Sequence, residues 1–357
     1  MSTFSLRAAL TAGALTIALA GLSACSNSTS DDATTGGTAS TAASADASNN
    51  ATTASTDYIA PRTMADGMGS GEADGVFPRT VTHFQGETTI EAEPQRVVVI
   101  STGQIDGVLT LGVVPVGTAA PDNTETVPQY LRDAFPNLSD QLDEITYVGS
   151  RTEPSIEDIA SLNPDLILVN NAGKKDSENL YESLTAIAPT VVTEGTGVNW
   201  KSDFLLLADA LGRTEQAQGI LDDYHEEADQ LATQVDPEET VSFLTKNGDR
   251  IRVYGVSSFS GSIAQDAGIS RPDSQTFTDE TALDISSEEL AQADGTWLFY
   301  GVNGGDNSEL ESLPLWNTLN AVSTDHAVAV DNDPFYLNAG PTAANLVLST
   351  LKERVAS

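Results

Sequence analysis

The sequence has few residues of the types that build disulfides, metal centres and nucleophilic active sites. One cysteine, Cys25, among 357 residues excludes an intrachain disulfide, and the three histidines, His83, His225 and His326, lie far apart along the chain. Carriers of zinc or manganese gather several His, Asp or Glu side chains around one ion. No G-x-x-x-x-G-K-[ST] or G-x-S-x-G motif occurs, and no Cys–His pair can form a nucleophile. We therefore expect no enzyme, no directly ligated metal and no cofactor.

Basic residues are also scarce. The chain has 16 Lys and Arg against 52 Asp and Glu, a formal charge of −36. Binding to nucleic acid needs patches of Lys and Arg, so we expect no nucleic-acid partner. A strongly negative charge suits a soluble, extracytoplasmic surface, and 357 residues are enough for two domains with their own cores.

A short apolar run occupies the N-terminus. Arg7 precedes residues 8–21, about 14 apolar residues, which are too few for a permanent membrane span. The run ends in Leu22-Ser-Ala-Cys25, which resembles the lipobox of bacterial lipoproteins, in which the cysteine carries lipid. We therefore expect a signal peptide at residues 1–24 and a mature protein anchored through Cys25 to the outer face of the cell membrane. An ordinary signal peptide with a chance cysteine is the alternative.

The next segment has the composition of a disordered tether. Residues 26–57 are almost all Ser, Thr, Ala, Asp, Gly and Asn, and cannot bury a core. We extend the expected tether to residues 25–78. About 50 such residues have a mean reach of about 40 Å.

Residues 79–199 predict an α/β lobe with a parallel sheet. A hairpin near residue 79 precedes the apolar strand RVVVI at residues 96–100, which is typical of a sheet covered on both faces. Strands and helices then alternate along the chain, and such βαβ units build parallel sheets.

A long amphipathic helix is expected at residues 214–235. Its apolar residues recur with i, i+3, i+4, i+7 spacing, Thr214 can cap its start, and Pro237 follows its end. About 22 residues give a rod of about 33 Å. We interpret residues 200–236 as helices that join two lobes; a crossover helix inside one large sheet is the alternative.

The alternation resumes in residues 237–357, which we assign to a second α/β lobe. An internal repeat supports this assignment. The stretch that begins at Ser155 and the stretch that begins at Ser286 align without a gap into the following strand. Each starts with a capping-box pattern and has a glutamate at the second helical position, Glu157 and Glu288. Acids also favour helix N-termini on electrostatic grounds alone.

From residue 94 to the C-terminus the chain resembles the periplasmic binding proteins of ATP-driven (ABC) importers for ferric siderophores, haem and cobalamin. The matching pieces include Leu162-Asn-Pro-Asp165-Leu-Ile-Leu168, Arg252-Val-Tyr254, Ser258-Phe-Ser-Gly261, Gly268-Ile-Ser-Arg271-Pro272 and Pro314-Leu-Trp316. The resemblance implies two Rossmann-like lobes with parallel-rich sheets, joined by one long helix, with the ligand between them and little closure on binding. It also implies that Glu157 and Glu288 dock onto arginines of a permease dimer.

Two positions depart from the siderophore-binding branch of this family. The branch usually has an arginine late in the first strand after the long helix, where this chain has Thr245 followed by Lys246. It usually has a tryptophan near the C-terminal loop, where this chain has Phe335 and Tyr336.

We expect the ligand at the carboxyl ends of the strands, where apolar walls and a few hydrogen-bond donors meet a chelate. Core packing or solvated loop charge is the alternative for each of the candidates. The candidates are Gln104, Ser150, Arg151, Asn170, Asn171, Lys174, Trp200, Arg252, Tyr254, Ser258, Phe259, Asn303 and Tyr336.

These observations predict a monomeric, lipid-anchored protein that binds a ferric siderophore and delivers it to an ABC importer. Because the cleft has few candidate cations, a neutral or cationic hydroxamate is favoured over a triply charged catecholate. Screening by salt weakens this argument, since only local charges matter once the ligand is bound. Haem or cobalamin as cargo on the same fold, and an extracellular enzyme or adhesin on this scaffold, are the alternatives.

Overall fold

The structure is a computed structural model that describes residues 58–101, 103–120, 125–171 and 177–356. The signal peptide, Cys25, the tether up to residue 57 and Lys174 lie outside the described residues. In the described part of the chain, no helix is long and apolar enough to cross a membrane.

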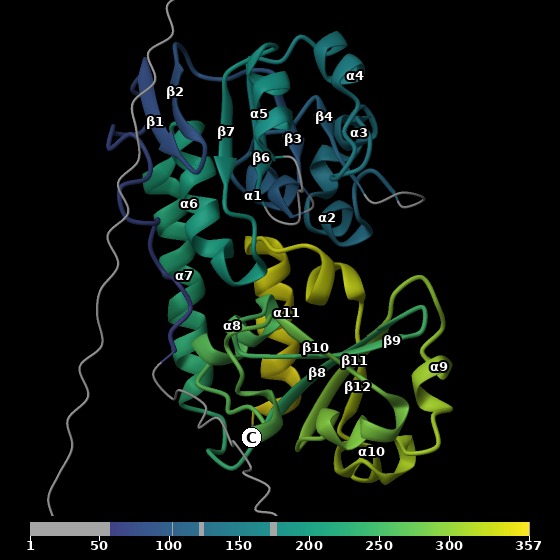
Figure 1. The fold of residues 1–357 in the computed structure, drawn as a ribbon. Coiled ribbons are helices and arrows are strands. Elements are labelled where there is room, and N and C mark those ends of the chain that lie inside the picture. The colour runs from purple at the N-terminus through teal and green to yellow at the C-terminus, as the bar shows by residue number, and fades with distance from the viewer. Residues whose placement is uncertain (1–57, 102, 121–124, 172–176, 357) are drawn as a thin grey trace, which may run out of the picture. The chain divides into compact units, whose positions relative to one another are not determined.

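The first lobe is built around a five-stranded parallel sheet in the order β5-β4-β3-β6-β7 (Figure 1). An antiparallel hairpin, β1 (Arg79–His83) and β2 (Gly86–Ile90), precedes it as expected. The sheet strands are β3 (Val97–Ile100), β4 (Gly117–Thr118), β5 (Thr146–Tyr147), β6 (Leu166–Asn170) and β7 (Thr190–Thr193). The helices of this lobe are α1 (Gln104–Thr110), α2 (Gln129–Ala134), η1 (Pro136–Leu138), α3 (Ser139–Asp143), α4 (Ile156–Ser161), α5 (Ser177–Thr185) and η2 (Gly197–Asn199).

Two helices, α6 (Trp200–Ala210) and α7 (Thr214–Ala232), join the lobes. The predicted apolar face of α7 is buried along Ala217, Leu221, Tyr224, Ala228 and Leu231. Because separate sheets lie before and after α7 in the chain, the alternative of one large sheet is wrong.

The start of α7 corrects the prediction that Thr214 caps it. Thr214 is the first helical residue, and the preceding Arg213 makes no side-chain cap. The carboxylate of Asp74 instead accepts the backbone N–H groups of Glu215 and Gln216 at 3.0 and 3.3 Å. A distant part of the chain thus satisfies two of the free N–H groups that every helix start leaves.

The second lobe has a mixed sheet in the order β10-β9-β8-β11-β12. Its strands are β8 (Val241–Asn247), β9 (Arg250–Tyr254), β10 (Ala282–Ile285), β11 (Trp297–Val302) and β12 (Ala327–Ala329). β8, β11 and β12 are parallel, whereas β9 runs antiparallel to both β8 and β10. The helices are α8 (Phe259–Asp266), η3 (Asp273–Gln275), η4 (Ser287–Ala293), α9 (Ser308–Glu311), η5 (Trp316–Thr318), α10 (Asn320–Ser323), η6 (Asp333–Leu337) and α11 (Pro341–Val355).

One hydrophobic cluster runs through the joint between the lobes. It contains β3 residues of the first lobe, the inner faces of α6 and α7, and residues of α8, β8 and α11 in the second lobe. Each lobe has a further cluster on the other face of its sheet. A core shared across the joint favours small relative motion of the lobes.

Residues 58–78, which we name the N-terminal strap, correct the predicted boundary of the tether. Ala60 is 1% exposed, Met64 and Met68 pack on the shared cluster, and Gly69 forms an antiparallel bridge with Thr82 of β1. The low apolar content around residues 26–57 does not extend into this segment, which carries Tyr, Ile, Met and Pro residues and packs on the folded body. The described structure therefore begins about 20 residues earlier than expected from composition.

Candidate ligand-binding cleft

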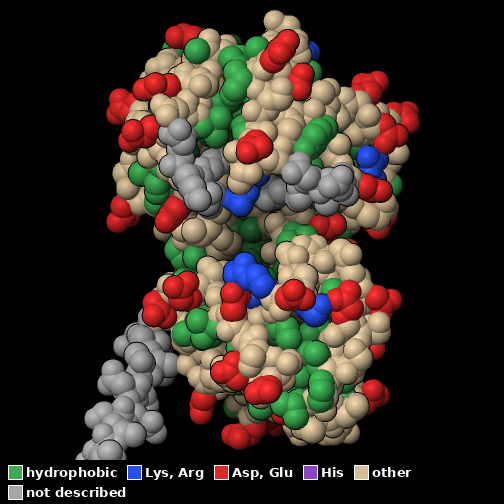
Figure 2. All heavy atoms as spheres, turned by 45° about the vertical axis from the view of Figure 1, so that its right-hand side comes forward, with side chains coloured by type: hydrophobic (Ala, Val, Ile, Leu, Met, Phe, Trp, Pro, Cys, Tyr) green, Lys and Arg blue, Asp and Glu red, His purple; other side chains and the backbone are tan. Residues whose placement is uncertain are grey.

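A cleft with a volume of about 1140 Å³ opens between the ends of strands from both lobes. The space-filling view shows the hollow, with basic side chains on both of its margins (Figure 2). The first lobe contributes the segments that follow β4 and β5, and the second lobe contributes the segments that follow β11 and β12. These are carboxyl ends of parallel strands, where the sequence places the ligand.

Two predicted residues of the first lobe, Ser150 and Arg151, line this cleft. They follow β5 in a loop that the Ser150 hydroxyl helps to shape, because it accepts the backbone N–H of Glu153 at 3.1 Å. Gln129 of α2 adds a neutral amide to the same wall.

Two predicted residues of the second lobe, Asn303 and Tyr336, line the opposite wall. The Tyr336 ring stacks on Tyr254 with a centroid distance of 5.1 Å, and its hydroxyl donates to the carbonyl of Phe299 at 2.8 Å. Tyr336 therefore supplies a fixed aromatic surface in the loop where the resemblance led us to expect a tryptophan.

Arg252 lies beside this aromatic pair in the sheet. It is the register partner of Thr245 on β8, the position at which the resemblance led us to expect an arginine. Its Nε donates to Asp284 of β10 at 2.9 Å, and Arg250 contacts the same carboxylate at 2.7 Å. The two guanidinium groups hold the pKa of Asp284 below its ordinary value. The contact with Asp284 directs the charge of Arg252 toward β10 at the sheet edge.

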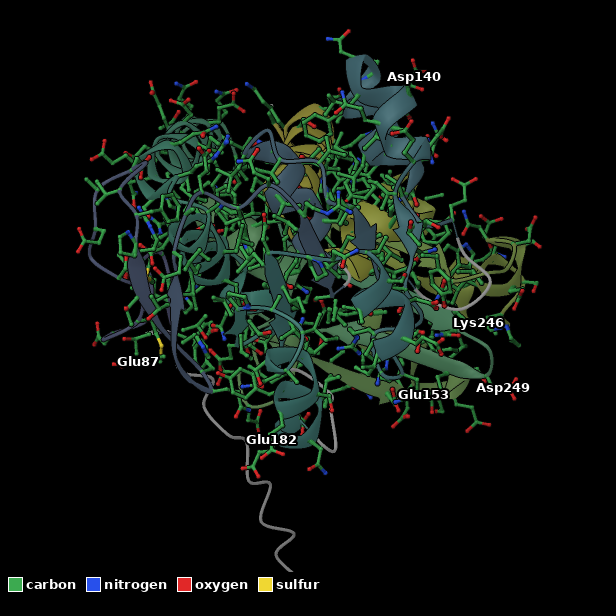
Figure 3. The ribbon with its side chains drawn as sticks, turned by 90° about the horizontal axis from the view of Figure 1, so that it is seen from above. Glu87, Asp140, Glu153, Glu182, Lys246 and Asp249 are labelled. Carbon is green, nitrogen blue, oxygen red and sulfur yellow. The ribbon has the colours of Figure 1, made fainter. Side chains whose placement is uncertain are left out.

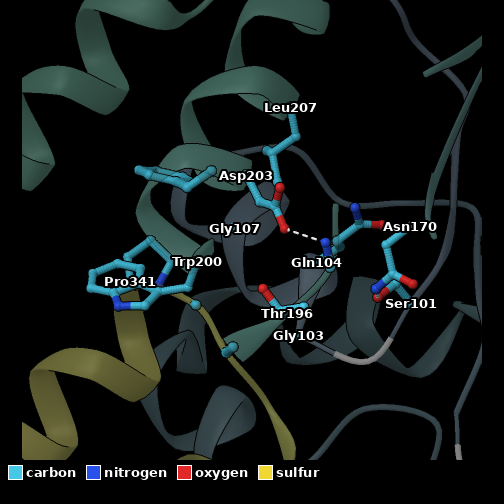
Figure 4. A pocket seen from close by; sticks show the side chains of 14 residues that line it. Ser101, Gly103, Gln104, Gly107, Asn170, Thr196, Trp200, Asp203, Leu207 and Pro341 are labelled. Atoms are coloured by element: carbon cyan, nitrogen blue, oxygen red, sulfur yellow. Dashed lines mark hydrogen bonds between the residues drawn. The ribbon is translucent and has the colours of Figure 1, made fainter. Parts of the chain in front are cut away.

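A second, smaller pocket of about 30 Å³ lies at the joint (Figure 4). Gln104 and Asn170 of the first lobe, Trp200 and Asp203 of α6, and Pro341 of α11 line it. The carbonyl oxygens of both amides, Gln104 Oε1 and Asn170 Oδ1, are buried without a protein hydrogen-bond partner. Gln104 donates to the Thr193 hydroxyl at 2.7 Å, and Asn170 donates to Ser101. Both predicted residues thus face a pocket at the strand ends.

Asp203 organises the loop beside this pocket. Its two carboxylate oxygens accept the backbone N–H groups of Glu194 and Gly195 at 3.0 and 2.7 Å. Burial raises the pKa of Asp203 to about 7, and the two backbone N–H groups oppose that rise. A Cβ at Gly195 would come within 2.4 Å of the Asn170 side chain, so only glycine fits this turn, whose φ is +85°.

Three residues predicted to contact ligand are buried in packing or capping contacts. Trp200 is 2% exposed and packs edge-on against Tyr224 and Phe259, and Phe259 is 6% exposed. Ser258 is buried and caps α8, because its hydroxyl accepts the backbone N–H of Gly261 at 3.0 Å. From the sequence, an aromatic residue near a helix start can belong either to a ligand-binding wall or to the core. Here Trp200 and Phe259 both belong to the shared hydrophobic cluster.

Asn171 and Lys174 complete the predicted set. The Asn171 Oδ1 accepts a hydrogen bond from Gln85 at 3.1 Å, which ties the end of β6 to the β1–β2 turn. Lys174 lies outside the described residues, so its place in the cleft stays a prediction.

A sequence profile described as "Periplasmic binding protein" matches residues 97–334. The chain belongs to the periplasmic binding protein family. It is therefore a solute-binding protein and not an enzyme, and the predicted two-lobed α/β fold is confirmed.

Curated relatives of this binding protein cover most of its length. The probable siderophore-binding lipoprotein YfiY of Bacillus subtilis (strain 168) is 30% identical over 308 residues, 81% of this chain and 91% of the relative. The Fe(3+)-citrate-binding protein YfmC of the same organism is 28% identical over 272 residues, 74% of this chain and 82% of the relative. Staphylococcus aureus SirA, solved in complex with staphyloferrin B, superposes with a TM-score of 0.66 at 24% identity, covering 77% of this chain and 97% of SirA.

The sequence reasoning missed the acidic residues of this binding protein's cleft. Glu125, Asp331 and Asp333 line it together with Arg151. Burial, and then the neighbouring carboxylate of Asp331, raise the pKa of Asp333 above its ordinary value. Taken alone, the Asp331-Asn-Asp333 stretch fits a solvated acidic loop. Its position two residues after β12 is the signal that places it at the cleft.

These acids do not form a metal centre with the other side chains of the cleft. Within the described ranges, no group of three or more His, Cys, Asp or Glu is arranged to hold a metal ion. The described cleft offers hydrogen-bonding groups, charged side chains and the ring of Tyr336 to a bound molecule.

Proposed function

We propose that this protein captures an intact ferric siderophore in the cleft between its lobes and delivers it to an ABC importer for iron uptake. Relatives that span most of the chain are named as siderophore- and Fe(3+)-citrate-binding proteins. The cleft supports this cargo class through its volume of about 1140 Å³, above the usual range of about 300–1,000 Å³ for small-molecule pockets. A complete chelate fits such a volume better than a bare ion does.

The charge of the cleft lining is the observation that favours a hydroxamate. Among the described lining residues, three acids, Glu125, Asp331 and Asp333, stand against one base, Arg151. A triply negative catecholate complex would bury its charge beside these carboxylates and would need several cations to replace its hydration. A neutral or cationic ferric hydroxamate avoids that cost, and Tyr336 with Tyr254 supplies aromatic contact.

Two further cations among the described residues of the second lobe have carboxylate partners. Lys246 contacts Glu309, and Arg252 contacts Asp284. Recruiting either one to an anionic ligand would require the loss of its present ion pair. The chelates in the names of the relatives differ from one another, so the argument for hydroxamate rests on this chain's own charges.

A side-by-side titration at two salt concentrations tests the proposed cargo. Intrinsic tryptophan fluorescence is followed during addition of a ferric tris-hydroxamate, a ferric tris-catecholate, haem and cobalamin. We expect the hydroxamate to bind most tightly at both salt concentrations. Tighter binding of the catecholate at both would overturn the hydroxamate assignment, and selective binding of haem or cobalamin would replace the siderophore as cargo.

The proposed delivery step uses one glutamate on each lobe. Glu157 lies in the first turn of α4 and Glu288 lies in the first turn of η4, and both are exposed. Ser286 and Glu289 form a complete capping box at the start of η4. At the start of α4, the Ser155 hydroxyl accepts the backbone N–H of Asp158, which is one of the two hydrogen bonds of such a box. Glu289 completes the cap of η4, and Asp158 is the acid at the capping position of α4. Glu157 and Glu288 are therefore available for arginines of a permease dimer.

The proposed location is the outer face of the cell membrane. Relatives of this chain are named as lipoproteins. We propose lipidation at Cys25 because of the Leu22-Ser-Ala-Cys25 sequence. We also propose that the protein is a monomer.

A further inference from the structure

The N-terminal strap has one anchor on the second lobe. The Gln265 side chain of α8 accepts the backbone N–H of Ala60 at 2.8 Å and donates to the carbonyl of Tyr58. One residue further along α8, Asp266 contacts the Arg62 guanidinium at 3.0 Å. The strap therefore binds α8 through two backbone contacts and one ion pair.

The Asp266 carboxylate is a junction between the strap, α8 and the joint helices. It also accepts from Lys201 of α6 at 2.5 Å and from the Tyr224 hydroxyl of α7 at 3.0 Å. The side chains of Lys201 and Asp266 are 0% and 2% exposed, whereas that of Arg62 is 43% exposed. Arg62 thus adds a second cation to a buried carboxylate from the outside.

The strap has its other anchor on the first lobe and on the junction between α6 and α7. Gly69 and Thr82 of β1 exchange two backbone hydrogen bonds of 2.9 and 3.1 Å. The backbone N–H and hydroxyl of Ser70 both donate to Asp209 of α6 at 2.8 Å. Asp74 then caps α7.

We propose that the N-terminal strap is a second mechanical connection between the lobes, which limits how far they move relative to one another. Only residues 63–68 separate the two anchors, and about six residues span at most about 20 Å when extended. The strap runs beside α7 in Figure 1, so that a relative twist or rotation of the lobes about the joint changes the path between the anchors. A chain this short cannot absorb a large change without losing one anchor.

A cut in the folded protein tests this connection without removing either anchor. A protease site is inserted between Asp66 and Gly67, where the chain is exposed and a Cβ at Gly67 would meet no atom within 4 Å. Spin labels are placed at Glu153 of the first lobe and Asp249 of the second, in a chain that carries Cys25→Ser. Both positions are exposed, and both lie on the same side of the molecule in Figure 3. The distance distribution between the labels is measured before and after cleavage, without ligand.

We expect cleavage of the strap to broaden the distance distribution between the lobes. A protease site between Glu91 and Ala92, in a loop of the first lobe only, is the matched control and leaves the distribution unchanged on cleavage. An unchanged width after complete cleavage of the strap would overturn the proposal. Because no ligand is used, this outcome is independent of the cargo.

A substitution provides a second measurement. Arg62→Ala removes the ion pair to Asp266, and amide hydrogen exchange of α8 should become about threefold faster or more. Asp66→Ala, at an exposed position in the same segment, is the matched control. Equal exchange in the two variants and the unaltered chain would contradict the role of the second-lobe anchor.

Discussion

At the residue scale, Asp203 shows how burial changes the behaviour of a carboxylate. Its pKa is raised to about 7 from the ordinary value of 3.8, chiefly by burial. Between these values the folded protein binds the proton and the unfolded chain does not. The contribution of this group to stability is therefore fully present below about pH 4 and is lost as the pH rises to about 7.

The first prediction concerns this pH dependence. The free energy of unfolding of the unaltered protein, relative to that of Asp203→Asn, should fall between about pH 4 and pH 7 and stay level above it. Urea unfolding at several pH values measures it. Asp165→Asn is the matched control, because Asp165 accepts the backbone N–H groups of Gln95 and Arg96 in the same paired manner at a less buried site. A difference that rises with pH would contradict the account.

The second prediction concerns Tyr336, whose ring is held by Tyr254 and by the carbonyl of Phe299. Tyr336→Ala should weaken binding of the ferric hydroxamate about tenfold or more, because an aromatic anchor in a pocket supplies much of the contact energy. Tyr336→Phe keeps the ring and should stay within about threefold of the unaltered protein. Fluorescence titration measures both, and Tyr181→Ala, on α5 of the first lobe, is the control. Equal affinities for Tyr336→Ala and Tyr336→Phe would remove the ring from the ligand site.

At the element scale, the sequence predicted the elements whose residue pattern is local. β3 is predictable because a strand buried on both faces has a continuous apolar run. α7 is predictable because a helix buried along one face has apolar residues at helical spacing. β10 could not be predicted from the sequence, because its residues, Ala282–Ile285, are partly exposed at a sheet edge and show no such pattern. The antiparallel direction of β9 was also missed. It depends on the short turn at Gly248, which brings β9 back alongside β8.

The candidate site was predictable only in part, for a related reason. Ser150, Arg151 and Asn303 lie within four residues of the carboxyl end of a strand, and Tyr336 follows β12 by seven residues. These segments meet at the cleft. Whether an aromatic residue faces the ligand or the core depends on which way its helix turns, and Trp200 shows the core outcome. The cap of α7 by Asp74 could not be predicted from the sequence, because Asp74 and Glu215, whose backbone N–H it accepts, are about 140 positions apart.

The third prediction concerns α4 and η4 as docking elements. Reversing the charge of Glu157 or Glu288 to Lys should reduce uptake of the ferric chelate several-fold and leave its affinity for the isolated protein unchanged, since both side chains lie outside the cleft lining. Uptake assays in cells and titration of purified protein measure the two properties. Glu182→Lys, at an exposed position on α5, is the control. Unchanged uptake with both charges reversed would return these glutamates to helix-start electrostatics alone.

At the scale of the whole molecule, the shared core through α6, α7, α8 and α11 joins the lobes more firmly than a flexible loop would. The N-terminal strap adds a second path between them. Small relative motion suits the proposed delivery step, in which a permease recognises one glutamate on each lobe, because the spacing of the two side chains then changes little.

The fourth prediction concerns attachment to the membrane. Cys25→Ala should release the protein into the medium, because the lipid is the proposed anchor and the apolar run before it is too short to span a bilayer. Immunoblots of membrane and medium fractions measure the release. Ser23→Thr, which keeps Cys25, is the control and should remain in the membrane fraction. Retention of unlipidated Cys25→Ala in the membrane would contradict the anchor.

The central claim is that the cleft recognises an intact ferric chelate. Isothermal titration calorimetry of the purified protein with a ferric tris-hydroxamate, and separately with Fe³⁺ in a weakly chelating buffer, tests it most directly. The account predicts saturable one-to-one binding of the chelate, weakened by Tyr336→Ala, and no binding of the free ion. Tight binding of free Fe³⁺, or chelate binding that Tyr336→Ala leaves unchanged, would contradict it.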